Sequence, residues 1–176
     1  AADDGSPAGT GARTILIEGL DGDYEPVSEV ITLNGITAVD GTQLFLRINK
    51  VTVLTVGSGG TNAGNITIRD NAAGTTREYI TAGDGESQSA AYCVPAGHVL
   101  LLDNWYMTAK DASGSSVAVA ADFRVTKYGM SSTVPWSVLM TGTFGTEFRT
   151  PHVIPEKADF EMRVTAVGGN DTVVNF

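Results

Sequence analysis

Apolar and polar residues alternate with a period of two along nearly the whole chain after the first twelve residues. Successive side chains of a β-strand point to opposite faces, so this alternation is typical of strands with one buried face. No window shows the 3.6-residue periodicity of an amphipathic helix. The pattern predicts short strands over residues 13–20, 25–33, 42–56, 65–70, 76–81, 87–94, 98–110, 115–128, 134–140, 146–150, 158–167 and 172–176.

Small and polar residues separate these segments where the chain can reverse. Asp21-Gly22, Asn34-Gly35 and Ser113-Gly114 are typical of tight turns, because glycine adopts positive φ without strain. Many short strands joined by such turns predict an all-β protein, with an antiparallel β-sandwich of jelly-roll-like type. We expect one domain over residues 13–176, preceded by a flexible N-terminal arm over residues 1–12.

The apolar positions of segment 42–56 change phase near Asn49 and Lys50. A shift of one residue moves every following side chain to the opposite face of the sheet. We therefore expect a β-bulge, or a switch of the chain between sheets, at this point.

Residues 92–109, YCVPAGHVLLLDNWYMTA, combine a chain reversal with much apolar surface. Pro95 lacks a backbone donor and Gly97 permits a reversal, so a corner between two strands is predicted there. Residues 99–102 are apolar on both faces of the next strand. We expect this strand to be buried on both sides, by the core within and by a loop, an arm or another subunit outside.

The charge balance argues against nucleic acid as a partner. With 20 acidic and 11 basic residues the net charge is −9, and a phosphate backbone repels such a chain unless its basic residues form a stripe. The basic residues are scattered along the sequence, so we expect no nucleic-acid binding.

No apolar run approaches the about 20 residues of a membrane span, and the first twelve residues lack the features of a signal peptide. We expect no membrane association.

The residues that most often carry catalysis are few. Cys93 is the only cysteine, so no intramolecular disulfide can form, and its apolar context predicts a buried, unreactive thiol. His98 and His152 each lie beside a strand boundary that contains proline, without the spacing of a zinc site. We expect structural roles for both histidines, no catalytic, cofactor-binding or metal-binding residues, no cofactor and no enzyme activity.

Two acidic segments offer a metal-binding alternative. Asp21, Asp23 and Glu25 could supply oxygen ligands to Ca²⁺, as could Asp84 and Glu86. Neither segment has the spacing of an EF-hand loop, and a solvated turn explains each of them. We therefore expect folding without a metal ion.

Carbohydrate binding is a second alternative, raised by five aromatic residues: Trp105, Tyr106, Trp136, Phe144 and Phe148. A sugar platform needs exposed, coplanar rings on one face. The neighbours Trp105 and Tyr106 must point to opposite faces of a strand, so we expect one in the core and the other exposed or at an interface. The sequons at residues 65–67 and 170–172 are expected to be coincidental, because the chain shows no secretion signal.

Four segments, taken in order, resemble one group of proteins. They are residues 17–39, 45–69, 90–109 and 153–166, which begin IEGLDGDYEP, FLRINKVTVL, AAYCVPAGHV and VIPEKADFEM. Together they are similar to virion structural proteins of β-sandwich type from marine and freshwater tailed bacteriophages and cyanophages. The matched features are turns and core strands, so the resemblance implies a particle component and carries over no site residues.

This resemblance implies a non-enzymatic role. We expect a capsid decoration or cement protein that binds the head surface of the virion, after synthesis in the host cytoplasm. Its expected partners are other copies of itself, as a homotrimer, and the major capsid protein. The alternative is a tail-fibre or receptor-binding module, with carbohydrate as a ligand.

Overall fold

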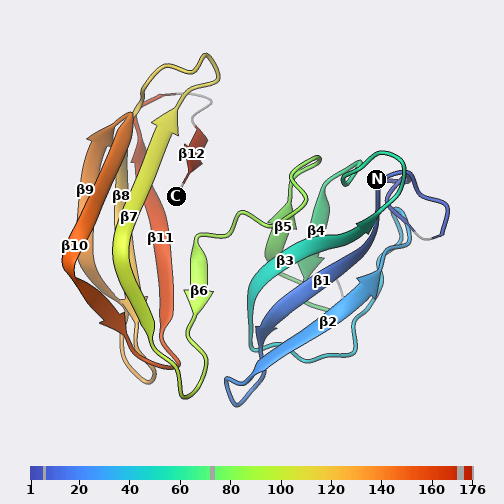
Figure 1. Cartoon of the computed structure of the whole chain (residues 1–176), viewed down its shortest axis with the longest axis horizontal. Coiled ribbons are helices and arrows are strands. Elements are labelled where there is room, and N and C mark those ends of the chain that lie inside the picture. Colours follow the sequence, from blue (N-terminus) through green and yellow to red (C-terminus); the bar gives the residue numbers. More distant parts are fainter. Residues whose placement is uncertain (6, 72–73, 170–172, 176) are drawn as a thin grey trace. The chain divides into compact units, whose positions relative to one another are not determined.

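The computed structural model describes residues 1–5, 7–71, 74–169 and 173–175, and all regular elements among them are β-strands (Figure 1). The chain divides into two compact units, Ala1–Ser89 (unit 1) and Ala90–Phe176 (unit 2). Every strand pair is antiparallel. The predicted all-β, antiparallel sandwich class is therefore confirmed.

Unit 1 consists of a three-stranded sheet and a hairpin. Its strands are β1 (Ala12–Leu20), β2 (Pro26–Thr32), β3 (Arg47–Val56), β4 (Ile66–Arg69) and β5 (Thr76–Ile80). The sheet has the order β2-β1-β3, and β4 pairs with β5. All five strands contribute to one core, made of Ala12, Ile15, Ile17, Ile31, Val51, Ile66 and Ile80. Burying each of the larger side chains contributes about 1.5–3 kcal/mol, which is why the alternation specifies which face turns inward.

The predicted irregularity in β3 is present. Glu18 pairs with Lys50, whereas the following Gly19 pairs with Ile48. Asn49 is the extra residue, so the change of phase in the sequence is a β-bulge and the expectation is confirmed. The start of segment 42–56 was wrongly predicted as strand, because β3 begins only at Arg47.

Unit 2 is a sandwich of two sheets. Its strands are β6 (Ala91–Cys93), β7 (Leu100–Lys110), β8 (Ala118–Thr126), β9 (Thr133–Thr141), β10 (Thr143–Ile154), β11 (Asp159–Val167) and β12 (Val173–Asn175). One sheet has the order β10-β7-β12 and the other β6-β11-β8-β9, and the two lie as layers in Figure 1. A jelly roll has eight strands, and the part of unit 2 that the structure describes has fewer, so this finer assignment is not confirmed.

Aromatic side chains fill the space between the two sheets of unit 2. Phe123 on β8 is fully buried, and its ring centre lies 4.7 Å from that of Trp136, 4.6 Å from that of Phe160 and 6.0 Å from that of Trp105. These contacts join strands of both sheets. Rings at such distances and inclinations stabilise each other beyond the effect of burial.

The division into two units differs from the single domain expected over residues 13–176. Each unit has its own core, and the boundary at Ser89 and Ala90 falls within a segment predicted as one strand, residues 87–94. Only Ala91–Cys93 forms a strand there. Period-two alternation shows which face of a strand is buried, but it does not show which strands share a core.

The segment predicted as a flexible arm, residues 1–12, is packed into unit 1. Asp4 is only 2% exposed. Its carboxylate accepts hydrogen bonds from the backbone N–H groups of Ala12 (2.7 Å), Ala63 (2.7 Å) and Gly64 (2.8 Å). Burial alone would raise the pKa of Asp4, but the bonds to its carboxylate outweigh burial, so its pKa lies below the usual range.

Backbone contacts join the same segment to the glycine-rich loop, residues 57–64. Gly57 donates to the carbonyl of Gly11 (2.8 Å), and Gly59 donates to the carbonyl of Thr10 (2.7 Å). Gly11 has no room for a Cβ atom, which would collide with the Asp4 carboxylate. The sequence prediction failed here because close backbone approach leaves no apolar pattern to detect.

Candidate functional site

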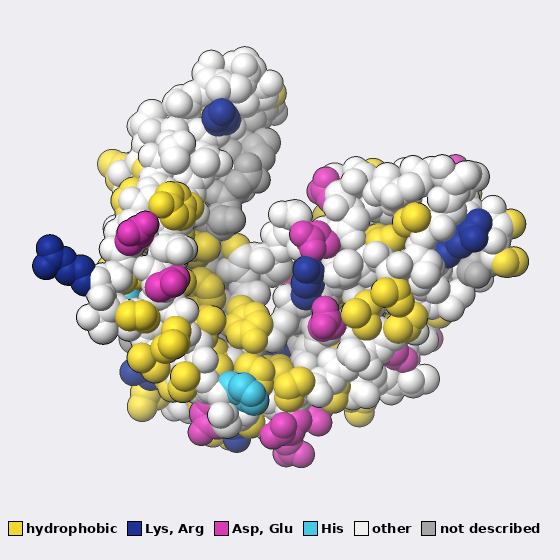
Figure 2. All heavy atoms as spheres, in the orientation of Figure 1, with side chains coloured by type: hydrophobic (Ala, Val, Ile, Leu, Met, Phe, Trp, Pro, Cys, Tyr) yellow, Lys and Arg dark blue, Asp and Glu magenta, His cyan; other side chains and the backbone are white. Residues whose placement is uncertain are grey.

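Unit 2 carries a group of exposed aliphatic side chains on the outer side of β7 and β10. Leu101 pairs with Val153 across the two strands, and Val99 lies just before β7. The three side chains are 57%, 62% and 59% exposed, respectively. We call these three residues the β7–β10 face; hydrophobic side chains reach the surface over the lower parts of both strands in Figure 2. Scattered exposed aliphatic residues are ordinary. Here, however, two of the three residues are cross-strand partners and the third lies two positions before Leu101.

The other side of the same strand is in the core. Leu100 and Leu102 pack against the buried cluster that contains Phe123 and Ile154. The sequence predicted that this strand would be buried on both sides, and within one chain the prediction is wrong for the outer side. Residues 99 and 101 are exposed there, so burial of the outer side by another subunit stays a prediction.

The two neighbouring aromatic residues of β7 divide as expected. Trp105 is buried against Phe123 and Phe144, whereas Tyr106 is exposed. Tyr106 pairs with Gly145 of β10, and a Cβ atom on Gly145 would collide with the tyrosine ring. The tyrosine ring therefore packs against Gly145 of β10, and Tyr106 is a single exposed aromatic side chain on this sheet.

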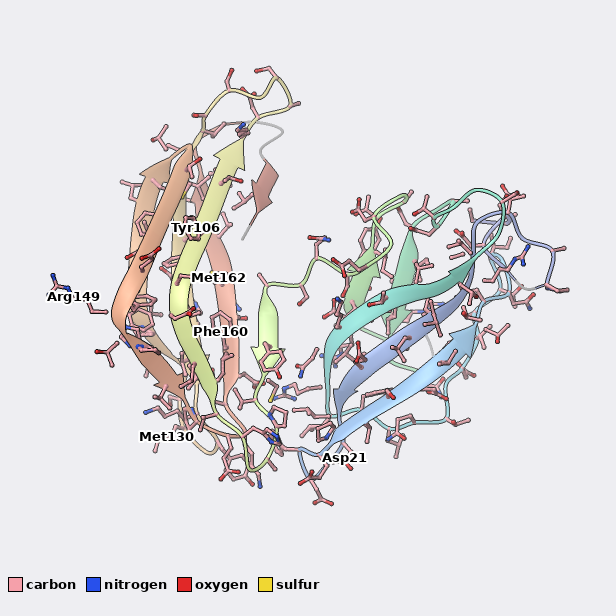
Figure 3. The ribbon with its side chains drawn as sticks, viewed as in Figure 1. Asp21, Tyr106, Met130, Arg149, Phe160 and Met162 are labelled. Carbon is pink, nitrogen blue, oxygen red and sulfur yellow. The ribbon has the colours of Figure 1, made fainter. Side chains whose placement is uncertain are left out.

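The remaining aromatic candidates do not form a coplanar platform. Trp136, Phe148 and His152 form a half-buried group, with ring centres 4.2–5.5 Å apart. His152 meets both aromatic rings edge-on, at 62° and 87°. This inclined packing is typical of stabilising aromatic contacts rather than of sugar stacking. Arg149 extends from β10 away from the sandwich (Figure 3).

The structure places the other candidate residues apart from one another. Cys93 is buried in β6, as predicted. The Nδ1 atom of His98 lies 2.8 Å from the carbonyl oxygen of Ala96, in the corner formed around Gly97, whose φ is 70°. Across the described ranges, no three His, Cys, Asp or Glu side chains gather in a way that could hold a metal ion.

The acidic segments serve local structure. The Asp21 carboxylate accepts hydrogen bonds from the backbone N–H groups of Asp23 (2.9 Å) and Glu25 (3.0 Å), which closes the turn after β1 (Figure 3). Glu86 forms an ion pair with Lys50 at 2.8 Å. An aspartate that bonds to the backbone two and four residues later is a common turn device, so a solvated turn accounts for the first segment.

Basic side chains are found beside acidic ones on the surface. Further ion pairs join Arg77 to Asp70 (2.7 Å), Arg124 to Asp122 (3.3 Å) and Arg163 to Glu161 (2.9 Å). Their main effect is on the surface potential, because a cation beside an anion adds little to a positive field.

A buried carboxyl group escaped the sequence analysis. Glu78 on β5 is buried, and burial raises its pKa, although hydrogen bonds with the side chains of Ser89 and Ser87 lower it. Glu78 lies two residues before the buried Ile80, so the alternation already placed it on the inner face. This group is part of the packing of unit 1, and among the described residues it belongs to no group of three or more side chains that could hold a metal ion.

The first of the two sequons, residues 65–67, lies within the described residues. There the side chain of Asn65 accepts a hydrogen bond from the backbone N–H of Ala82. The second sequon, residues 170–172, lies outside the described residues. None of the described segments is a helix long and apolar enough to cross a membrane.

Comparison of the chain with known protein families, with curated proteins and with solved structures finds no match.

Proposed function

We propose that this protein is a non-enzymatic structural component of a bacteriophage particle. In this proposal it is a capsid decoration or cement protein, which binds the head surface and stabilises the shell through repeated subunit contacts. The observation that carries the proposal is the β7–β10 face, where Val99 and Leu101 are exposed on the outer side of the apolar segment 99–102 and Val153 is exposed beside Leu101 on β10.

The size of this face supports a repeated contact rather than a tight isolated dimer. Stable interfaces bury about 800 Å² per partner, with roughly 20–30 residues a side. Three aliphatic side chains form the apolar centre of a much smaller contact. Such a contact is weak alone, but a lattice makes it many times over, and the linked contacts then add in avidity.

The charge distribution supports unit 2 as the part that meets other copies. Unit 1 holds twelve acidic and five basic residues, a net charge of −7, whereas unit 2 holds eight and six, a net charge of −2. Like charges oppose association, so the nearly neutral unit approaches a second copy with less repulsion. We propose a homotrimer on the head surface, with the major capsid protein as its second partner.

Replacing Leu101 and Val153 with serine tests the subunit contact. We expect wild-type protein to self-associate weakly as its concentration rises in sedimentation equilibrium, and the double variant to lose at least about tenfold in association constant. Leu139→Ser is a matched control, because Leu139 is 80% exposed on β9. A double variant that associates as well as the control would exclude the β7–β10 face.

The alternative function is a tail-fibre or receptor-binding module that binds carbohydrate. The observation that favours it is Tyr106, which is exposed and packs against Gly145. Binding of the protein to a glycan array, abolished by Tyr106→Ala and kept by the Leu101 and Val153 double variant, would favour this alternative over the decoration protein.

A further inference from the structure

The turn that follows β2 contains an Asn-Gly peptide at the point where the N-terminal residues pack onto unit 1. Thr37 donates to the carbonyl of Asn34 (3.0 Å), and Gly35 has a φ of 62°. A tight turn with glycine at its first central position has this geometry. Asn34 is exposed, and among the described residues its side-chain amide has no hydrogen-bond partner.

An asparagine followed by glycine can lose its side-chain amide without an enzyme. The backbone nitrogen of the glycine attacks Cγ of the asparagine, a new N–Cγ bond forms, and the side-chain nitrogen leaves as ammonia with the proton of the backbone nitrogen. Water then opens the cyclic imide at either of its carbonyls, which gives aspartate or isoaspartate. Glycine favours the attack because it has no Cβ atom to obstruct its nitrogen.

The packed N-terminal residues hold the attacking nitrogen. The N–H group of Gly35 donates to the carbonyl of Asp4 (2.6 Å). Gly5 pairs with Asn34 in an antiparallel bridge, and a Cβ atom on Gly5 would lie only 2.9 Å from the nitrogen of Gly35. This nitrogen is both hydrogen-bonded and covered by backbone, so residues 4 and 5 must move away before it can attack.

The Asp4 carboxylate determines how often that movement occurs. It accepts three backbone hydrogen bonds, from Ala12, Ala63 and Gly64, and so anchors the residue whose carbonyl binds Gly35. A local opening has its own free energy, which can be smaller than that of global unfolding. When reclosing is faster than the chemical step, the rate of that step follows the open fraction.

We propose that Asn34 is a modification site protected by residues 1–5, which deamidates when this segment undocks. The product then opposes renewed docking. Isoaspartate lengthens the backbone of the turn, which breaks the register in which Gly5 pairs with position 34. Either product also adds a carboxylate to unit 1, whose net charge is already −7. Deamidation thus makes a reversible opening permanent. This inference is independent of the proposed function.

The test follows deamidation of the full-length protein at mildly alkaline pH, by peptide mapping with mass spectrometry. We expect Asn34 to convert at least about tenfold faster in Gly5→Ala than in wild type, because the added methyl group displaces Gly5 from the nitrogen of Gly35. Gly22→Ala is the matched control in the same unit, because a Cβ atom there meets no atom within 4 Å. It should convert like wild type, and wild-type protein unfolded in urea should convert fastest.

Two further variants separate undocking from a general loss of stability. Asp4→Ala removes the anchor of the segment and should also convert Asn34 at least about tenfold faster than wild type. Phe123→Ala weakens the core of unit 2. It should leave the rate at Asn34 unchanged, and an increase as large as that of Asp4→Ala would overturn undocking as the step that exposes the site.

The remaining outcomes decide the other parts of the proposal. Equal rates in wild type, Gly5→Ala and Asp4→Ala would overturn the protection by residues 1–5, as would a wild-type rate equal to that of the unfolded chain. An intact Asn34 in urea would overturn the site itself. Hydrogen exchange of the purified deamidated protein tests the consequence, because the amides of Ala12, Ala63 and Gly64 should lose protection. Full protection there would show that the modified chain still docks, against the proposal.

Discussion

Asp4→Ala is expected to destabilise unit 1 by about 3 kcal/mol at neutral pH. The substitution removes the acceptor for three backbone N–H groups, those of Ala12, Ala63 and Gly64. Hydrogen bonds to a charged group contribute about 1.5–3 kcal/mol each, and donors left without an acceptor in a buried site cost more than the lost bonds alone. The measurement is hydrogen exchange of the full-length protein, in which protection over β1 and the loop 57–64 should fall.

The effect of this substitution should depend on pH in a defined direction. The folded-state pKa of Asp4 lies below the unfolded value of about 3.9. The stability from ionised Asp4 is therefore fully present above about pH 4, and it is lost as the pH falls through the folded pKa. The difference between wild type and Asp4→Ala should accordingly be largest at neutral pH and shrink in acid.

Asp3→Ala is the matched control, because Asp3 is exposed and the change removes the same charge. It should leave protection in unit 1 within about 0.5 kcal/mol of wild type. Equal protection in the Asp3 and Asp4 variants would contradict the packing of residues 1–12 and restore the expectation of a free arm.

Phe123→Ala is expected to destabilise unit 2 by about 3–5 kcal/mol. Phe123 is fully buried and contacts Trp105, Trp136 and Phe160. The truncation loses the transfer energy of the ring and leaves a cavity that four strands cannot close without shifting. Both tryptophans of the chain lie in unit 2, so tryptophan fluorescence during denaturant unfolding reports on this unit.

Phe123→Leu separates the size of the side chain from the loss of an aromatic contact. It keeps an apolar side chain in the site and should cost about half as much as alanine. An alanine variant with the wild-type unfolding midpoint would show that the two sheets of unit 2 do not share this core.

Much of the fold follows from local chemistry that the sequence displays. The bulge at Asn49 was predicted because a change of apolar phase has one structural meaning. The corner at Pro95 and Gly97 follows from the missing backbone donor of proline and the positive φ of glycine. The opposite orientations of Trp105 and Tyr106 follow from the period of two. These features depend on neighbours in the chain, so a single sequence is enough to predict them.

Contacts between distant segments could not be predicted in this way. The bonds of Asp4 to Ala63 and Gly64 span about sixty residues, and their only trace in the sequence is glycine in both segments. The clamp of Glu29 on Thr42 and Gln43 has no local signature either. Both of these carboxylates bond to backbone N–H groups, which every residue except proline carries, so side-chain patterns do not reveal the pairing.

The sequence predicted some of the exposed apolar residues but not that they are exposed. The apolar run 99–102 indicated a strand with two apolar sides, and the structure shows that Leu101 and Val153 form its outer row. Ile36 and Leu44 fell in segments assigned to turn and strand, where an apolar residue is usually interpreted as core. Their exposure is evident only when β2 and the segment that follows it are placed side by side.

The most direct test of the proposed function is a reconstruction of the intact particle at a resolution that shows β-sheets. The proposal predicts many copies of this chain on the head, in symmetric positions, with the β7–β10 face against a neighbouring copy. A few copies at the tail would support the receptor-binding alternative, and a particle without the protein would contradict a virion role.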